Sequence, residues 1–209
     1  IVEVLERRTR EVVGRLHRRG DGIRKGPRPR RLLLEPLEDR RLLYCHAGLF
    51  DDYPLSLGND GSSSAINIGF TIGFKGLESS QLYVNENGNV TFDGPLSDKP
   101  WEFWSSRLGE PDFFSLNTPI LAPFFADVDV TKGGSVKWGR ETLYNRPAFG
   151  VTWSTVDFYG SGSATVPKNT FQLVIVNRDD TGAGNFDIEF NYNSITWEAG
   201  QQDGGNSQG

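Results

Sequence analysis

The sequence is poor in the side chains that most enzymes and metal sites use. Its 209 residues contain one Cys, two His and no Met. A single Cys excludes an internal disulfide, and a Cys-based zinc site needs more thiols. The imidazoles are His17 and His46, so the chain beyond residue 46 supplies neither a Ser-His-Asp triad nor a His metal site. No apolar run approaches the roughly 20 residues of a membrane-spanning helix, and we expect no transmembrane segment.

The two ends of the chain carry opposite charge. Residues 1–44 contain 13 Arg and Lys against 7 Asp and Glu, a net charge of +6, whereas residues 45–209 carry a net charge of −11. Such asymmetry is typical of a tail joined to a separate domain. We therefore expect a basic leader, residues 1–44, and an acidic globular body, residues 45–209. Because position 1 is Ile and Met is absent, we expect a piece of a larger protein.

The leader has apolar residues at roughly helical spacing, with arginines between them, from Val2 to Leu16. A basic amphipathic helix can lie on an anionic membrane or bind nucleic acid. The alternative is a poorly ordered segment, because Gly14, Gly20 and Gly22 weaken a helix. No aromatic side chain stands among the arginines to stack on bases, so we expect no nucleic-acid partner.

Residues 30–43 form a distinct motif, RRLLLEPLEDRRLL. Its Leu-Glu-Pro and Arg-x-Leu-Leu positions resemble the LEPR-XLL leader found near the start of large bacterial surface or secreted proteins. The resemblance implies an exported, multidomain bacterial protein in which the leader serves as an address. We interpret Cys45 as a lone thiol, because Tyr44 does not suit the position before a lipoprotein cleavage site.

Beyond residue 50 the sequence has the pattern of short β-strands. Residues 66–74 alternate large apolar residues with small or polar ones, which indicates a half-buried strand. Asn87 and Gly88 stand between two alternating runs and predict a hairpin with a type I′ turn. Residues 120–130 are apolar enough for one buried strand.

Three later strands are predicted from alternating apolar positions: Phe149, Val151 and Trp153; Phe171, Leu173 and Ile175; Phe186, Ile188, Phe190 and Tyr192. In the last of these strands, Asp187, Glu189 and Asn191 are expected on the opposite, solvent-facing side. Strands at regular spacing without a helical pattern after residue 50 predict an all-β fold, an antiparallel sandwich or barrel. The leader is expected to be poorly ordered or partly helical.

Four blocks of the body resemble the nidogen-like extracellular (NIDO) domain family. They are residues 82–92, LYVNENGNVTF; residues 119–129, PILAPFFADVD; residues 148–153, AFGVTW; and residues 170–175 with 186–197, TFQLVI and FDIEFNYNSITW. The blocks occur in the family's order across residues 64–200. The family pattern continues through a Gly-rich turn into further strands, so we expect the body to be truncated at its C-terminus, with an unpaired sheet edge.

The resemblance implies an extracellular, non-catalytic module of adhesive and matrix proteins, associated with cell–matrix adhesion. It implies a matrix or surface protein or glycan as partner, and it supplies no catalytic residues and no cofactor. Asn89-Val90-Thr91 is a glycosylation sequon that we interpret as strand sequence.

Carboxylates are the remaining candidates for chemistry. Asp127 and Asp129 follow an apolar strand and precede a Gly turn, so they are candidate calcium ligands, since calcium takes 6–8 oxygen ligands. The alternative is that Asp127 caps a turn while Asp129 faces solvent. Asp187 and Glu189 share a strand face and could form a glycosidase pair, or simply a polar face.

A carbohydrate-binding module is the other alternative function. Trp101, Trp104 and Tyr159 are aromatic side chains that could stack on sugars if they were exposed, or could instead cover the core. Binding to a glycan that is lost when Trp101 or Trp104 is replaced by Ala would separate this alternative from a protein-binding module.

Overall fold

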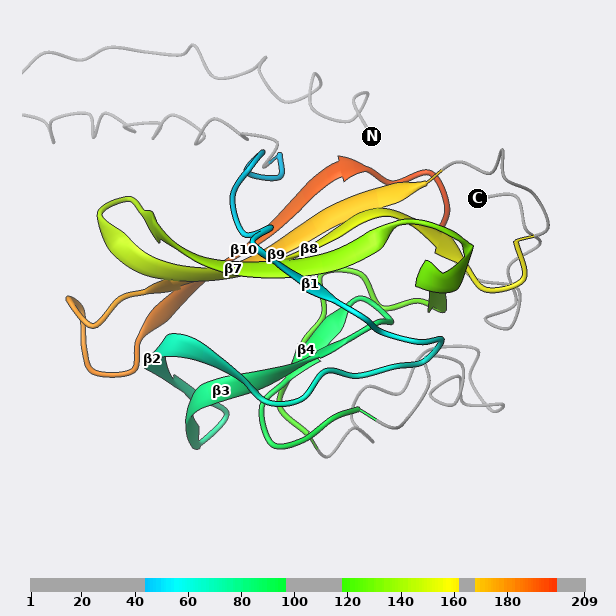
Figure 1. The fold of residues 1–209 in the computed structure, drawn as a ribbon. Helices are drawn as coiled ribbons and strands as arrows, with labels where there is room; N and C mark the ends of the chain where they lie inside the picture. Colours follow the sequence, from blue (N-terminus) through cyan, green and yellow to red (C-terminus); the bar gives the residue numbers. More distant parts are fainter. Residues whose placement is uncertain (1–43, 97–117, 162–167, 199–209) are drawn as a thin grey trace, which may run out of the picture. The chain divides into compact units, whose positions relative to one another are not determined.

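The structure of the protein is a computed structural model that describes residues 44–96, 118–161 and 168–198. Two antiparallel sheets pack face to face as a sandwich (Figure 1). The all-β prediction is therefore confirmed, and a sandwich is formed rather than a barrel. Apart from Tyr44, the predicted leader lies outside the described residues, so its boundary with the body stays a prediction.

The large sheet has the strand order β1-β7-β8-β9-β10, and β6 pairs with β8. Its strands are β1 Tyr53–Leu55, β6 Val128–Asp129, β7 Ser135–Leu143, β8 Arg146–Phe158, β9 Asn169–Asn177 and β10 Phe186–Ser194. The small sheet has the order β2-β3-β4-β5. Its strands are β2 Ile66–Phe74, β3 Leu77–Asn85, β4 Asn89–Thr91 and β5 Ile120–Leu121. A 3₁₀ turn, η2 (Val130–Lys132), follows β6. No helix among the described residues is long and apolar enough to cross a membrane.

Alternating apolar residues of the two sheets form the core between them. From the small sheet, the buried residues include Ile68, Leu82, Val84 and Val90. From the large sheet they include the predicted apolar faces of β8 and β9: Phe149, Val151, Trp153, Phe171, Leu173 and Ile175, none of which is exposed. The rings of Trp153 and Phe171 stack with their centroids 5.1 Å apart. The period-two pattern therefore identified the inward faces of these strands correctly.

The predicted strand over residues 120–130 is wrong in its length. Only β5 and β6 are extended there, and residues 122–127 between them are irregular. The physical reason is that the two short strands join different sheets, since β5 pairs with β4 and β6 pairs with β8. The chain has to leave one sheet and cross to the other, and Pro123, which has no N–H to donate to a ladder, lies in the crossing segment.

The predicted hairpin is confirmed, but its type I′ turn is wrong. Asn85 pairs with Asn89, so β3 and β4 are joined by a three-residue turn, residues 86–88, in which only Gly88 has a positive φ, +76°. A type I′ turn needs positive φ at two central residues. Two-residue turns of that kind join β2 to β3 at Lys75-Gly76 and β7 to β8 at Tyr144-Asn145.

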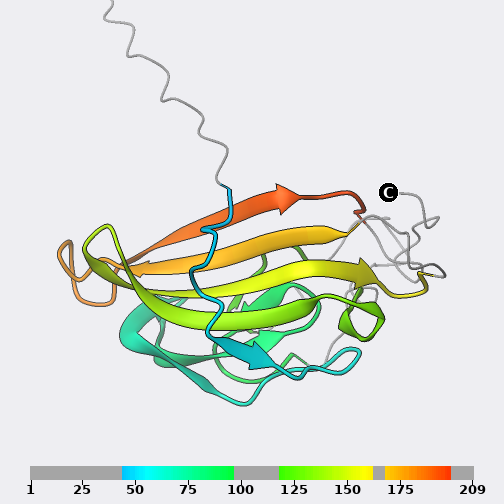
Figure 2. The same cartoon turned by 45° about the horizontal axis from the view of Figure 1, so that its top comes forward.

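A segment ahead of β1 covers part of the outer face of the large sheet. Residues 45–50, the strap, cross β10, β9, β8 and β7 in turn (Figure 2). The strap ends in Phe50, which is fully buried against Ala148, Val174 and Val176. Phe50 lies over two paired glycines, its ring over Gly150 and its backbone over Gly139. A Cβ on Gly150 would come within 2.4 Å of the Phe50 ring, and one on Gly139 within 2.7 Å of the Phe50 Cα.

Replacing Phe50 by Ala is expected to lower the free energy of unfolding by about 3 kcal/mol, because a fully buried ring is removed. Tyr53→Ala, which removes an exposed ring that stacks on Trp138, is expected to cost about 1 kcal/mol. Urea unfolding of the full chain measures both values. Gly150→Ala should destabilise the wild type and leave the Phe50→Ala protein nearly unchanged. If Gly150→Ala lowered the free energy of unfolding equally in the wild type and in the Phe50→Ala protein, Phe50 would not lie against Gly150 in solution.

Candidate functional site

The turn between β3 and β4 is buried, which is unusual for a hairpin loop. Glu86 is 0% exposed and Asn87 is 6% exposed. The indole N–H of Trp153, on the large sheet, donates to the carbonyl oxygen of Glu86 at 3.1 Å. The turn at the end of one sheet is thereby bonded to the centre of the other.

Hydrogen bonds from the segment after β5 satisfy the polar groups of this buried turn. Glu86 Oε1 accepts from the Val130 N–H at 2.7 Å, and Asn87 Oδ1 accepts from the Val128 N–H at 2.9 Å. The Gly88 carbonyl accepts from the Phe124 N–H at 3.3 Å. Residues 82–92 and 119–129, two of the sequence blocks that carry the family resemblance, are therefore in direct contact.

Gly88 has a steric reason to be glycine as well as a conformational one. Its φ is positive, and a Cβ there would lie 1.7 Å from the carbonyl oxygen of Phe124. No rotamer change relieves a clash with backbone, so a side chain at position 88 would push the two blocks apart.

The carboxylate of Glu86 is held in an environment that favours its neutral form. Burial raises the pKa of Glu86 from 4.5 to about 7, and the nearby charge of Asp129 adds to the shift. The hydrogen bonds from the N–H groups of Val130 and Gly61 act in the opposite direction. Sequence reasoning did not identify Glu86 as an unusual group, although its place in a predicted turn is known from the sequence; a turn is expected to be solvated.

Asp127 and Asp129, the predicted calcium ligands, are both buried, at 0% and 2% exposure. Asp129 Oδ1 accepts from the N–H and the hydroxyl of Thr131 and so caps the start of η2. The expectation that Asp129 faces solvent is wrong, and Asp129 itself has a capping role. The reason is that Asp129 belongs to β6, where it is paired with Asp157 of β8. Among the described residues, no three His, Cys, Asp or Glu side chains gather closely enough to hold a metal ion.

Asp187 and Glu189, the predicted glycosidase pair, bind different partners. Asp187 Oδ2 accepts from Arg178 Nη1 at 2.6 Å near the β9–β10 turn. Glu189 Oε2 lies 2.8 Å from His46 Nε2, on the strap. The expected solvent-facing side of β10 is therefore wrong for Glu189 and for Asn191, which is 0% exposed. The strap covers this side of β10, and nothing in the sequence around β10 predicts that cover.

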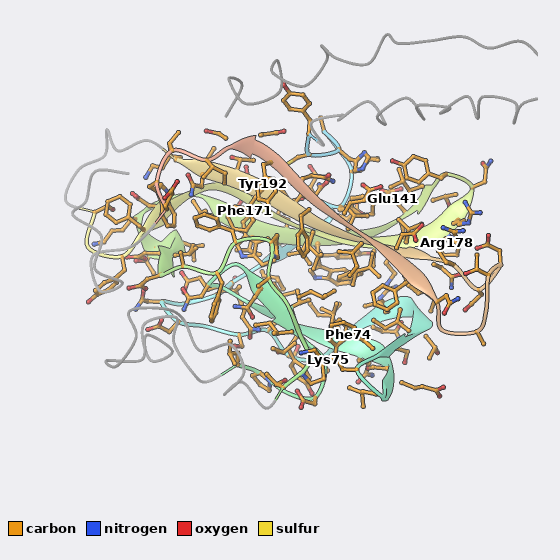
Figure 3. The ribbon with its side chains drawn as sticks, turned by 180° about the vertical axis from the view of Figure 1, so that it is seen from behind. Phe74, Lys75, Glu141, Phe171, Arg178 and Tyr192 are labelled. Atoms are coloured by element: carbon orange, nitrogen blue, oxygen red, sulfur yellow. The ribbon has the colours of Figure 1, made fainter. Side chains whose placement is uncertain are left out.

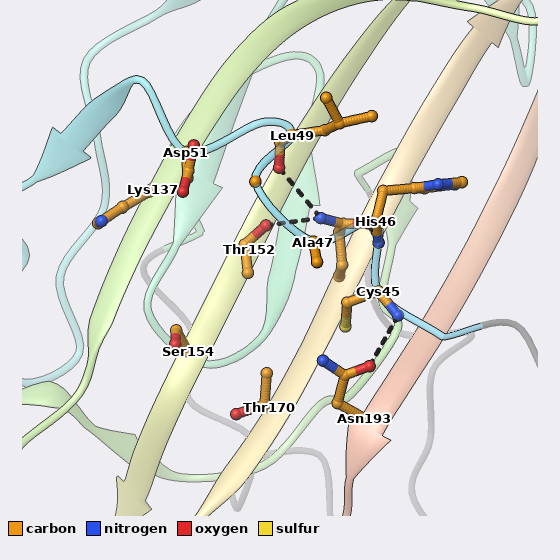
Figure 4. Close-up of a pocket in the computed structure, with 12 residues that line it drawn as sticks. Cys45, His46, Ala47, Leu49, Asp51, Lys137, Thr152, Ser154, Thr170 and Asn193 are labelled. Atoms are coloured by element: carbon orange, nitrogen blue, oxygen red, sulfur yellow. Dashed lines mark hydrogen bonds between the residues drawn. The ribbon is translucent and has the colours of Figure 1, made fainter.

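Beside the strap lies a polar pocket of about 180 Å³ on the outer face of the large sheet (Figure 4). It is lined by Cys45, Lys137, Ser154, Thr170 and Asn193, among others. The Cys45 N–H donates to Asn193 Oδ1 at 2.9 Å, and burial raises the pKa of the Cys45 thiol, which lowers its reactivity. The paired glycines Gly139 and Gly150 are the sequence signal for a close approach to this face.

The remaining candidates do not meet at one site. Trp101 and Trp104 lie outside the described residues. Tyr159 is half-buried and its N–H donates to the carbonyl of Asp127. Asn89 is 0% exposed and its Oδ1 accepts from Asn85 Nδ2 at 2.7 Å, so the sequon is part of the buried strand β4, in agreement with its interpretation as strand sequence.

Comparison with known proteins identifies the family of this fold. The model of the family described as NIDO related matches residues 52–209. The chain belongs to the NIDO-related family. Alpha-tectorin of Homo sapiens is 34% identical over 171 residues, which cover 70% of this chain and 7% of alpha-tectorin. Nidogen-2 of Mus musculus is 27% identical over 130 residues, which cover 62% of this chain and 9% of nidogen-2. No solved structure matches the chain.

The NIDO-related chain thus spans less than a tenth of the length of these relatives. The relatives are extracellular matrix proteins, which confirms the extracellular localisation that the resemblance implied. They are structural proteins rather than enzymes, which fits a non-catalytic domain. The bacterial origin, the LEPR-XLL leader and the truncation stay predictions.

The raised pKa of Glu86 predicts that the domain loses stability as the pH rises. The folded state binds a proton more tightly than the unfolded state, whose carboxyl has its ordinary pKa of 4.5. The contribution of the protonated form is complete below that value and is lost as the pH rises through about 7. The full loss is about 3 kcal/mol.

Urea unfolding at about pH 5 and about pH 8 measures this effect, and Glu86→Gln is the matched control because it stays neutral at both values. The wild type should lose more stability than Glu86→Gln between the two, with the variant the more stable protein at the higher pH. Parallel pH profiles for the two proteins would contradict the prediction.

The calcium prediction for Asp127 and Asp129 has a separate test. If both carboxylates bind calcium, millimolar calcium raises the midpoint of thermal unfolding above its value in EDTA, and Asp127→Asn abolishes the rise. If Asp129 serves only as a cap, the midpoint is equal in calcium and EDTA. Asp129→Ala then costs about 1 kcal/mol, and Asp129→Asn, which keeps an acceptor oxygen, costs less.

Proposed function

We propose that the NIDO-related domain is a non-catalytic adhesion module with which a larger surface or secreted protein binds an extracellular matrix or surface partner. The single observation that carries the proposal is the family match over residues 52–209, together with relatives that are extracellular matrix proteins. The bacterial origin of that larger protein is part of the proposal, and it rests on the motif at residues 30–43.

The polar side chains of residues 82–92 and 119–129 bind groups of the domain itself, which supports a non-catalytic function. Glu86, Asn87 and Asp129 direct their side-chain oxygens at backbone N–H groups of the same domain. A catalytic site instead aims its polar groups at a space that a substrate can enter. Glu86 and Asn87 therefore serve to hold the two sheets together, and Asp129 fixes the start of η2. The binding of a partner falls to the exposed surfaces of the sandwich.

The proposal predicts saturable binding of the full chain to at least one matrix protein on a panel of coatings, such as collagen, laminin and fibronectin, measured by surface plasmon resonance. Heat-unfolded chain serves as the control, because an interaction that depends on the folded surface disappears with it. A glycan array is screened in parallel with Trp101→Ala and Trp104→Ala. Protein binding that both variants retain supports the proposal.

Two results would favour another function over adhesion. Glycan binding that is lost in either Trp variant would identify a carbohydrate-binding module. Hydrolysis of a glycan that is lost in Asp187→Asn and Glu189→Gln would identify a glycosidase, although the separate partners of these two carboxylates argue against a shared site. If the chain bound none of the matrix proteins and glycans tested, that result alone would contradict an adhesion function.

A further inference from the structure

The two edges of the large sheet differ in how they are protected. A free strand edge exposes unpaired backbone groups, and proteins commonly protect it with a short strand, Pro or Lys. At one edge, β1 has three residues and includes Pro54. At the other edge, β10 has nine residues and contains neither Pro nor Lys. Among the described residues β10 pairs with β9 alone, and Figure 2 shows it as the outermost strand of that side.

The strap contacts β10 through Cys45, whose thiol donates to the carbonyl oxygen of Asn191 at 3.6 Å. Beside this contact the β10 edge carries exposed apolar side chains. Ile188 is 41% exposed and Tyr192 is 39% exposed, and Phe190 lies half-buried between them on the same side of the strand. Tyr192, labelled in Figure 3, is fixed in this position. Its hydroxyl donates to the carbonyl of Pro123 at 2.7 Å. A long edge strand with apolar residues on one side is a template for pairing with another strand.

We propose that β10 pairs antiparallel with β10 of a second copy of this chain, with Phe190 of one copy opposite Phe190 of the other. This contact is isologous, so each cross-strand pair other than the central Phe190–Phe190 pair occurs twice. Ile188 then lies opposite Tyr192 of the partner copy, which is a favourable pair of a β-branched and an aromatic side chain. The proposal is independent of which external partner the module binds.

Charge selects this register over its neighbours. With Phe190 at the centre, Asp187 lies opposite Asn193 and Glu189 opposite Asn191, so no two carboxylates face each other. A register centred on Ile188 places Asp187 opposite Glu189, and one centred on Glu189 places Glu189 opposite itself; like charges directly opposite are destabilising. A register centred on Asn191 avoids this repulsion but sets Ile188 against Ser194, at the irregular end of the strand.

Cysteine cross-linking tests the register, because the native chain has one thiol and Cys45→Ser gives a Cys-free background. One sample carries Ile188→Cys, a second carries Tyr192→Cys, and a third mixes the two proteins in a glutathione redox buffer. We expect a disulfide-linked dimer in the mixture alone, since residues 188 and 192 of different copies are opposite each other while two copies of position 188 are far apart. Equal dimer in the single-variant samples, or no dimer in the mixture, would overturn the proposal.

Sedimentation of the full chain tests the association without a cross-link. The double variant Ile188→Lys, Tyr192→Lys sets Lys opposite Lys and should weaken the dimer about tenfold or more. Tyr53→Lys, which places the same charge on an exposed residue of the other edge strand, is the matched control and should leave the dimer unchanged. Because residues 45–209 carry a net charge of −11, the wild-type dimer should tighten as salt is added. A wild-type monomer at all protein concentrations, or equal weakening by the control, contradicts the proposal.

Discussion

The hydrogen bond from the Trp153 indole to the carbonyl oxygen of Glu86 is the interaction on which the rest of the structure depends. It joins the centre of the large sheet to a turn of the small sheet that is buried from solvent. A buried turn is stable only if its polar groups find partners, because an unmade hydrogen bond in the interior is costly. The N–H groups of Phe124, Val128 and Val130 supply these partners.

This constraint explains why the chain departs from simple alternation where it does. Residues 120–130, predicted as one strand, form two short strands, because β5 pairs with the small sheet and β6 pairs with the large sheet. Asp129 is drawn into the large sheet and is used as a cap, while Glu86 is held where its neutral form is favoured. The carboxylates of Glu86 and Asp129 therefore stabilise the fold by accepting hydrogen bonds from backbone N–H groups. A metal ion bound to either carboxylate would compete with these hydrogen bonds.

The outer surfaces have a different organisation from the core. The strap covers one part of the large sheet with Phe50 in the slot above Gly139 and Gly150, and it pairs His46 with Glu189. The edge strand β10 keeps exposed apolar residues beside this covered area. The proposed adhesion function needs exposed surfaces on a rigid support, and the hydrogen bonds between the buried β3–β4 turn and the large sheet contribute to that support.

The sequence by itself determined the all-β class, the family, the inward faces of β2, β8 and β9, and the position of the β3–β4 hairpin. These follow from period-two alternation and from short motifs, which are local properties of the chain. Tertiary structure alone decided which polar residues are buried. Glu86 stands in an ordinary turn sequence, and Glu189 and Asn191 alternate like a solvent face, yet each is covered by a segment more than 40 residues away in the chain. Burial depends on those distant partners, so no local pattern could predict it.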